Sequence, residues 1–90
     1  MSKSLWIKAD GTRQEVYPKN GADFQLDELQ AMVGGNIELA ETVDGRYLVA
    51  NEEGLLLQLP INNLATEIYK YGYHAPIVGD VVVCDKNLIQ

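Results

Sequence analysis

Hydrophobic and polar positions alternate with a period of two near the middle of the chain. Over residues 37–40, Ile and Leu alternate with Glu and Ala, which is typical of a strand that is buried on one face. The dipeptide Asp44-Gly45 follows, and residues 47–49 supply the aromatic and β-branched residues favoured in a return strand. This pattern predicts a hairpin with a two-residue type I′ turn, because Asp and Gly tolerate the positive φ that such a turn requires.

A second turn and an apolar run follow the hairpin. Asn51 opens this turn and Gly54 closes it, as a type I turn prefers. The run Leu55–Leu59 is mostly apolar, and Pro60 ends it. We therefore expect a third strand over residues 55–59, which would complete a three-stranded antiparallel meander. Such a strand would span about 17 Å at ~3.3 Å per residue, and would hold the polar groups at its two ends apart.

The N-terminal third of the chain predicts a hairpin followed by a helix. Residues 5–8 and 14–17 flank Asp10-Gly11, a further turn signal. The helix is predicted over residues 25–33, and Gly34-Gly35 ends it. The apolar face expected for this helix consists of Leu26, Leu29, Met32 and Val33.

The C-terminal third predicts a second helix and a central strand. Asn62 or Asn63 can cap a helix over residues 64–71. The valines of residues 81–83 do not alternate with polar residues, so residues 78–84 are expected to form a strand buried on both faces. The resulting order β-β-α-β-β-β-α-β predicts one α+β domain over residues 1–90, with a small, mostly antiparallel sheet and two short helices.

Charge is unevenly distributed, and this narrows the partners to consider. The 90 residues carry a net charge of −6, and residues 23–53 hold eight acids against one base. Direct nucleic-acid binding is not expected, because it needs Lys and Arg to neutralise phosphates. An acidic face fits a basic partner surface. Charged residues that only keep a small protein soluble would give the same composition.

Other classes of protein are disfavoured by composition. No apolar run approaches the length of a membrane span or of a signal-peptide core, so we expect a cytoplasmic protein without membrane contact. Cys84 is the one cysteine, which rules out an internal disulfide and a zinc cluster of cysteines. Its apolar neighbours predict a buried, unreactive thiol.

Several polar residues near the turns are candidates for binding. The amides of Asn51, Asn62 and Asn63 can read the donors and acceptors of a ligand, although turn and cap chemistry explains the same positions. Glu52 and Glu53 are adjacent carboxylates, and neighbouring side chains in a turn usually diverge. A shared catalytic role for this pair is therefore not expected.

The densest aromatic stretch contains Tyr69, Tyr71, Tyr73 and His74. A ring here can stack on a base, and the imidazole can donate to a phosphate, whereas packing of a helix face and a loop is the plainer role. His74 has no Cys or second His nearby, so no metal site is expected. No constellation of nucleophile and base is visible, so the sequence predicts a protein that is not an enzyme and that uses no cofactor.

The central stretch resembles a known family. The motif V-G-G-x-I-E-L lies at residues 33–39, N-E-E-G at 51–54, L-P-x-N at 59–62 and a closing I-V-G-D-V-V-V at 77–83. These segments resemble the family of unknown function numbered 3846, over about residues 30–85. Members of that family occur mainly in phages and mobile elements of Gram-positive bacteria. The resemblance implies an accessory protein that acts against host defence, and implies no enzymatic activity.

Two functions remain open on this reading. The first is sequestration of a small cyclic nucleotide immune signal by a homo-oligomer, with sites between subunits. Its expected ligand-binding residues are Asn51, Asn62, Asn63, Arg46, Tyr71, Tyr73 and His74. Within this set, the helix start at Asn62 is expected to contribute more than the acidic turn, because carboxylates repel phosphate.

The second function is inhibition of a host defence protein by an acidic surface that covers its basic, nucleic-acid-binding surface. The expected partner-binding residues are Glu38, Glu41, Glu52 and Glu53.

Overall fold

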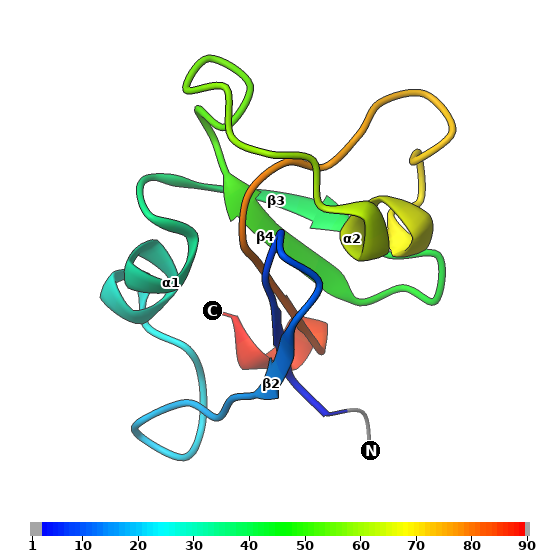
Figure 1. Cartoon of the computed structure of the whole chain (residues 1–90). Helices are drawn as coiled ribbons and strands as arrows, with labels where there is room; N and C mark the ends of the chain where they lie inside the picture. Colours follow the sequence, from blue (N-terminus) through cyan, green and yellow to red (C-terminus); the bar gives the residue numbers. More distant parts are fainter. Residues whose placement is uncertain (1–2, 90) are drawn as a thin grey trace.

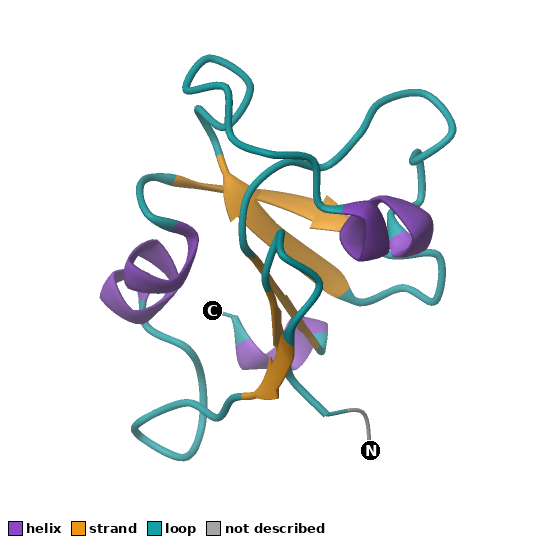
Figure 2. Cartoon of the chain, in the orientation of Figure 1, coloured by secondary structure: helices purple, strands orange, loops and turns teal. Residues whose placement is uncertain are grey.

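The computed structural model describes residues 3–89, which form a five-stranded antiparallel sheet with one helix on each face (Figures 1 and 2). The strand order is β2-β1-β5-β4-β3, so the last strand in sequence lies at the centre. The small α+β fold predicted from the sequence is confirmed. In chain order the elements are β1 (Leu5–Ile7), β2 (Arg13–Glu15), α1 (Leu26–Val33), β3 (Ile37–Glu41), β4 (Tyr47–Asn51), α2 (Asn63–Ile68), β5 (Val81–Cys84) and the 3-10 helix η1 (Lys86–Leu88).

The central strand β5 is buried on both faces, as its run of valines predicts, but it begins at Val81 and not at residue 78 as expected. Val81 and Val83 pack with Leu48 in the core beneath α2, while Val82 packs with Leu29 in the core beneath α1. Each of the four β5 residues has an exposed fraction of 0%. Two helices are thus needed to cover the two apolar faces of one short strand.

The boundaries of α1 agree with the prediction, but its buried face differs. Gln25 and Glu28 form a capping box, and the helix ends at Gly34 with φ of 84°. Leu26, expected in the core, is 58% exposed, whereas Glu28 is buried. The Glu28 carboxylate accepts hydrogen bonds from the backbone N–H of Gln25 and of Lys19. These two bonds draw the first turn toward the preceding loop, and this orientation leaves Leu26 in solvent.

The hairpin between β3 and β4 is confirmed, but the prediction of a two-residue type I′ turn was wrong. Thr42 and Arg46 close a three-residue loop, in which the N–H of Gly45 donates to the carbonyl of Thr42. Gly45 has φ of 86°, and Asp44 is not among the residues with positive φ. The Thr42 hydroxyl donates to the Asp44 carboxylate, which holds Asp44 in the loop. A type I turn followed by a left-handed glycine results.

Residues 55–59 do not form the predicted third strand of a meander. They continue as successive turns, with the N–H of Leu57 donating to Glu53 and the N–H of Leu59 donating to Gly54. Gln58 has φ of 56°, which is incompatible with a strand. The reason is topological: β4, the strand that such a meander would extend, is already paired with β3 on one side and with β5 on the other, so it has no free side for this segment. Because residues 55–59 are not extended, the separation of about 17 Å expected between the polar groups at the two ends of this segment does not apply.

The second helix is shorter than predicted, because the chain leaves it to pair with the end of β3. Asn62 is the N-cap, and the helix ends at Ile68 instead of Tyr71. Tyr69 bridges Thr42, and the N–H of Lys70 donates to the carbonyl of Glu41. Helical geometry beyond Ile68 would forfeit this bridge. None of the helices over residues 3–89 has the length and apolar character to cross a membrane.

Candidate functional site

A groove follows the outer edge of β3. It consists of two hollows with volumes of about 170 and 280 Å³, and Glu38 and Ile77 line both of them. We call this surface the β3 groove. The first hollow is completed chiefly by Asn51, Glu52, Leu55 and Val78, and the second by Leu39, Glu41, Tyr69 and Tyr71. In Figure 1 the segment that follows β4 and the segment that follows α2 cross above β3, where Ile61 bridges Val78.

The backbone of β3 is open along part of this groove. The N–H of Glu52 donates to Asn36, and the N–H of Thr42 donates to Arg46. In an antiparallel ladder this register turns the N–H and C=O groups of Ile37 and Leu39 away from β4. The carbonyl of Glu41 is occupied by Lys70, so the pairing that begins beside the hairpin stops there. Two residues of β3 are therefore available to an added strand.

Apolar side chains line the groove without being covered. Leu39 and Tyr71 are each 47% exposed, and Leu55 is 71% exposed. Tyr69 and Tyr71 meet edge to face, with ring centroids 5.9 Å apart. A wall of this kind contributes to binding by burying apolar and aromatic area.

The charge of the groove is negative. Glu38 and Glu52 have no ion-pair partner among residues 3–89, whereas Glu41 forms an ion pair with Lys86 at 2.9 Å. The hydrogen bond from Lys86 lowers the pKa of the Glu41 carboxyl. No Lys, Arg or His within the described chain lines either hollow. The groove therefore favours cationic groups over phosphates.

Two of the predicted asparagines serve the fold. Asn51 is 4% exposed; its Nδ2 donates to the carbonyl of Val33, and its Oδ1 accepts from the N–H of Glu53. Asn62 is 1% exposed and uses its amide within the core. Both amide hydrogens of Asn62 are used in these bonds, and Asn51 is buried with one of its two amide hydrogens bonded to Val33. Asn63 is exposed at the first position of α2 and lines neither hollow of the groove.

The remaining ligand candidates are dispersed. Arg46 pairs with Asp44 at the β3–β4 hairpin, with Nε to Oδ2 at 3.0 Å. Tyr73 and His74 contact each other in the exposed loop after α2, with ring centroids 4.5 Å apart. Of the seven residues expected to bind a nucleotide, Asn51 and Tyr71 line the β3 groove, and they lie in different hollows. A single subunit therefore does not bring the seven expected ligand-binding residues together in one site.

The four glutamates expected to bind a partner lie closer together than the seven residues expected to bind a nucleotide. Glu38 lines both hollows, Glu52 lines the first and Glu41 the second, while Glu53 is exposed beside them. Sequence reasoning missed the apolar lining by Leu39, Tyr69 and Ile77. Alternation alone assigns Leu39 to the core, and only the edge position of β3 leaves it half exposed.

Two further kinds of chemistry can be compared with the part of the chain that the structure describes: metal binding and reaction at the thiol of Cys84. No three His, Cys, Asp or Glu side chains cluster as metal ligands within residues 3–89. Burial raises the pKa of the Cys84 thiol to about 11, and the nearby Asp85 carboxylate acts in the same direction. A thiol of this kind is a poor nucleophile.

Comparison with known proteins agrees with the resemblance noted in the sequence. Neither the curated proteins nor the solved structures include a match to this chain. One family model, described as Domain of unknown function (DUF3846), matches residues 4–88. The match takes in every strand and both helices of the sheet fold. The chain therefore belongs to the DUF3846 family.

Proposed function

We propose that this protein is a binding module that takes an extended, basic segment of another protein into the β3 groove and thereby covers a basic surface of that partner. The observation that carries the proposal is the coincidence of three features at one place. The backbone of Ile37 and Leu39 is open, aromatic and aliphatic side chains are exposed beside it, and the carboxylates of Glu38 and Glu52 are unpaired within the described residues.

Strand addition explains how affinity arises at this edge. An extended segment that pairs with β3 gains main-chain hydrogen bonds with Ile37 and Leu39, and these bonds are independent of its sequence. Side chains on alternate positions of the added strand then point into the groove or away from it. Those that enter lie over the face of Glu38, Tyr71 and Ile77, while those on the opposite face lie beside Leu39, which suits an apolar residue.

Charge explains the selectivity. A Lys or Arg on the added strand can pair with Glu38 or Glu52, and the net charge of −6 attracts a basic surface before contact. Acidic segments would place like charges against Glu38. We expect binding to weaken as salt rises, because exposed charges are screened over ~8 Å at physiological ionic strength.

The target class rests on the family resemblance alone. That resemblance implies a host defence protein, whose basic nucleic-acid-binding surface would be the one covered. Nucleotide sequestration is the weaker proposal, because a phosphate would find no Lys or Arg lining the β3 groove and no free donor on Asn62.

A short peptide that alternates Lys with Val tests the proposal directly. Titration into isotopically labelled protein should shift the amide resonances of Ile37, Leu39 and Tyr71, whereas a peptide that alternates Glu with Val should not. Replacing Glu38→Lys and Glu52→Lys together should lower the affinity for the Lys-Val peptide by about tenfold or more. The matched control is Asp27→Lys with Glu67→Lys, which changes net charge equally at exposed positions outside the groove.

Two results would overturn the proposal. One is equal loss of binding in the control pair, which would reduce the effect to net charge. The other is calorimetric binding of a cyclic dinucleotide by a protein that ignores the Lys-Val peptide, which would restore nucleotide sequestration as the preferred function.

A further inference from the structure

The sheet has a second open edge, formed by β2 at the opposite side from β3. The N–H of Val16 donates to Ser4 and the N–H of Lys8 donates to Thr12. This register turns the backbone N–H and C=O groups of Arg13 and Glu15 away from β1. All three β2 residues are exposed. Unpaired backbone of this kind is a template for another strand.

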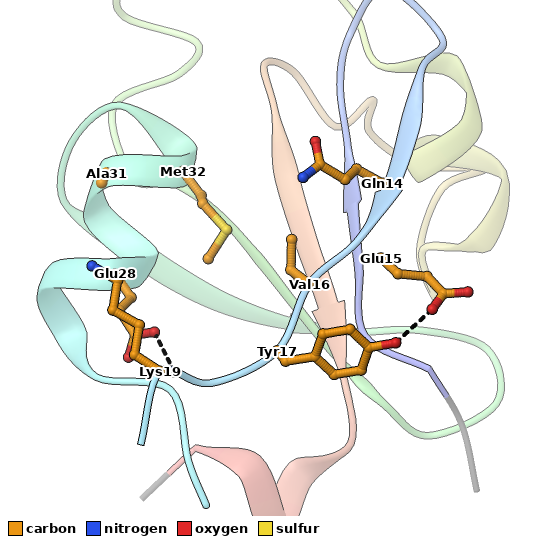
Figure 3. A pocket seen from close by; sticks show the side chains of 8 residues that line it. All are labelled: Gln14, Glu15, Val16, Tyr17, Lys19, Glu28, Ala31 and Met32. Carbon is orange, nitrogen blue, oxygen red and sulfur yellow. Dashed lines mark hydrogen bonds between the residues drawn. The ribbon is translucent and has the colours of Figure 1, made fainter. Parts of the chain in front are cut away.

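A hollow of about 400 Å³ lies beside this edge, between β2 and α1. Figure 3 shows Met32 reaching from α1 toward Val16, with Gln14 on the same side of β2. The carboxylate of Glu28 accepts a hydrogen bond from the backbone N–H of Lys19 at the far end of this hollow. A strand added to β2 would cover Val16 and Met32.

We propose that the occupant of this edge is the β2 strand of a second copy of the chain, related by a two-fold axis beside Gln14. In that register Arg13 faces Glu15 of the partner subunit, and Glu15 faces the partner's Arg13. Both pairs exchange two backbone hydrogen bonds, because these are the residues whose backbone points outward. Opposite charges across a strand pair are stabilising.

The charges of β2 select this register over its neighbours. Centring the axis on Arg13 or on Glu15 would place like charges opposite each other, which is destabilising. Arg13 has no ion-pair partner in the structure of residues 3–89, while Glu15 pairs with Lys3 at 2.9 Å. Arg13 is therefore a free cation that a second copy satisfies.

The wider charge distribution favours the same arrangement. Residues 1–22 carry four bases and two acids, whereas the chain as a whole is acidic. Pairing through β2 keeps the two acidic β3 edges at the far ends of a continuous sheet, so the segments that meet carry only the small net charge of four bases and two acids each. Both β3 grooves stay open in this dimer, so the inference does not depend on what they bind. Two grooves on one particle would let a repetitive partner bind with avidity.

Charge exchange tests the dimer by sedimentation velocity across a range of concentrations. Arg13→Glu and Glu15→Arg should each raise the dimer dissociation constant by about tenfold or more, because each places like charges opposite at two positions. The double variant Arg13→Glu with Glu15→Arg should recover dimerisation, since it restores opposite charges in the same register. Circular dichroism of each variant checks that the fold is retained.

Cross-linking tests the position of the axis. A Gln14→Cys variant should form a disulfide-linked dimer under mild oxidation, because the residue at the axis faces its own copy at about 4.5 Å between Cα atoms. Thr12→Cys is the control, because it would face Val16 of the partner subunit and not itself. A wild-type monomer at all concentrations would overturn the inference. A dimer that is indifferent to charge exchange, or that cross-links equally at residue 12, would overturn it too.

Discussion

The side-chain amide of Asn62 donates to the backbone carbonyl of Ile7, 55 residues earlier in the chain, at 3.0 Å. The same nitrogen donates to the carbonyl of Gly79 at 2.9 Å, while Oδ1 accepts from the N–H of Ala65 at 3.0 Å. One asparagine thus joins β1, the segment before β5 and the start of α2. It lies where the first and last strands of the sheet meet.

Asn62→Ala should destabilise the protein by about 2–4 kcal/mol. Loss of a helix cap costs about 1 kcal/mol, and each buried carbonyl left without a donor adds about 1 kcal/mol or more. Asn62→Asp keeps the cap acceptor but removes both amide donors, so it should be at least as damaging. Chemical denaturation measures both variants, with the exposed Asn63→Ala as the control. A fully stable Asn62→Asp would show that capping is the whole role.

Gly45→Val should destabilise by about 1–2 kcal/mol. Gly45 has φ of 86°, and a β-branched residue resists this left-handed conformation. No atom lies within 4 Å of the position that its Cβ would occupy, so the cost arises from the backbone alone. Val43→Ala, in the same loop and at an exposed position, should leave the denaturation midpoint nearly unchanged. An unchanged midpoint for the Gly45 variant would mean that the loop can readjust.

Asp44 should contribute stability that depends on pH. Hydrogen bonds from Thr42 and Arg46 lower the pKa of its carboxyl below the ordinary value. The folded state therefore favours the charged form, so the contribution is complete above the unfolded pKa of about 4 and disappears as pH falls through the lower folded value. It should be no more than about 0.5 kcal/mol, because solvent screens the exposed carboxylate.

Asp44→Asn provides the comparison for this pH dependence. The difference in melting temperature between wild type and Asp44→Asn should be constant near neutral pH and should shrink below about pH 4. A difference that grows on acidification would contradict the assigned direction of the pKa shift.

Leu56→Ser should have little effect on stability, about 0.5 kcal/mol or less. Leu56 is 77% exposed, in the turns that replace the predicted strand. Leu48→Ser is the contrasting variant, because Leu48 has an exposed fraction of 0% in the core and its loss should cost several kcal/mol, about 3 or more. Thermal melts of both variants decide the point. A large loss from Leu56→Ser would place residues 55–59 in the core.

Cys84 should resist thiol reagents until the protein unfolds. Its pKa is raised to about 11, so the thiolate fraction at pH 8 should be about 100-fold below that of an ordinary thiol, and burial slows access further. Labelling by a chromogenic disulfide reagent should be slow in buffer and complete in denaturant. Rapid labelling in buffer would require frequent opening of β5.

Local patterns in the sequence determined the elements whose cause is local. The N-terminal hairpin follows from its turn signal, α1 ends where Gly34 permits a left-handed residue, and the unbroken valines of β5 require burial on both faces. These features depend on the conformational preferences of single residues and their near neighbours. The acidic character of residues 23–53 likewise needs no structure to be seen.

The tertiary structure decided the features that depend on which strands pair with each other in the sheet. Leu55–Leu59 has the composition of a strand, but β5 pairs with β4 from the far end of the chain and leaves that segment exposed in turns. The same pairing order places β3 at an edge, which exposes Leu39 and opens the groove. Asn62 could be predicted as a cap, yet its bonds to Ile7 and Gly79 join segments far apart in sequence. No local pattern encodes such contacts, because strand pairing and burial are settled only when the whole sheet is assembled.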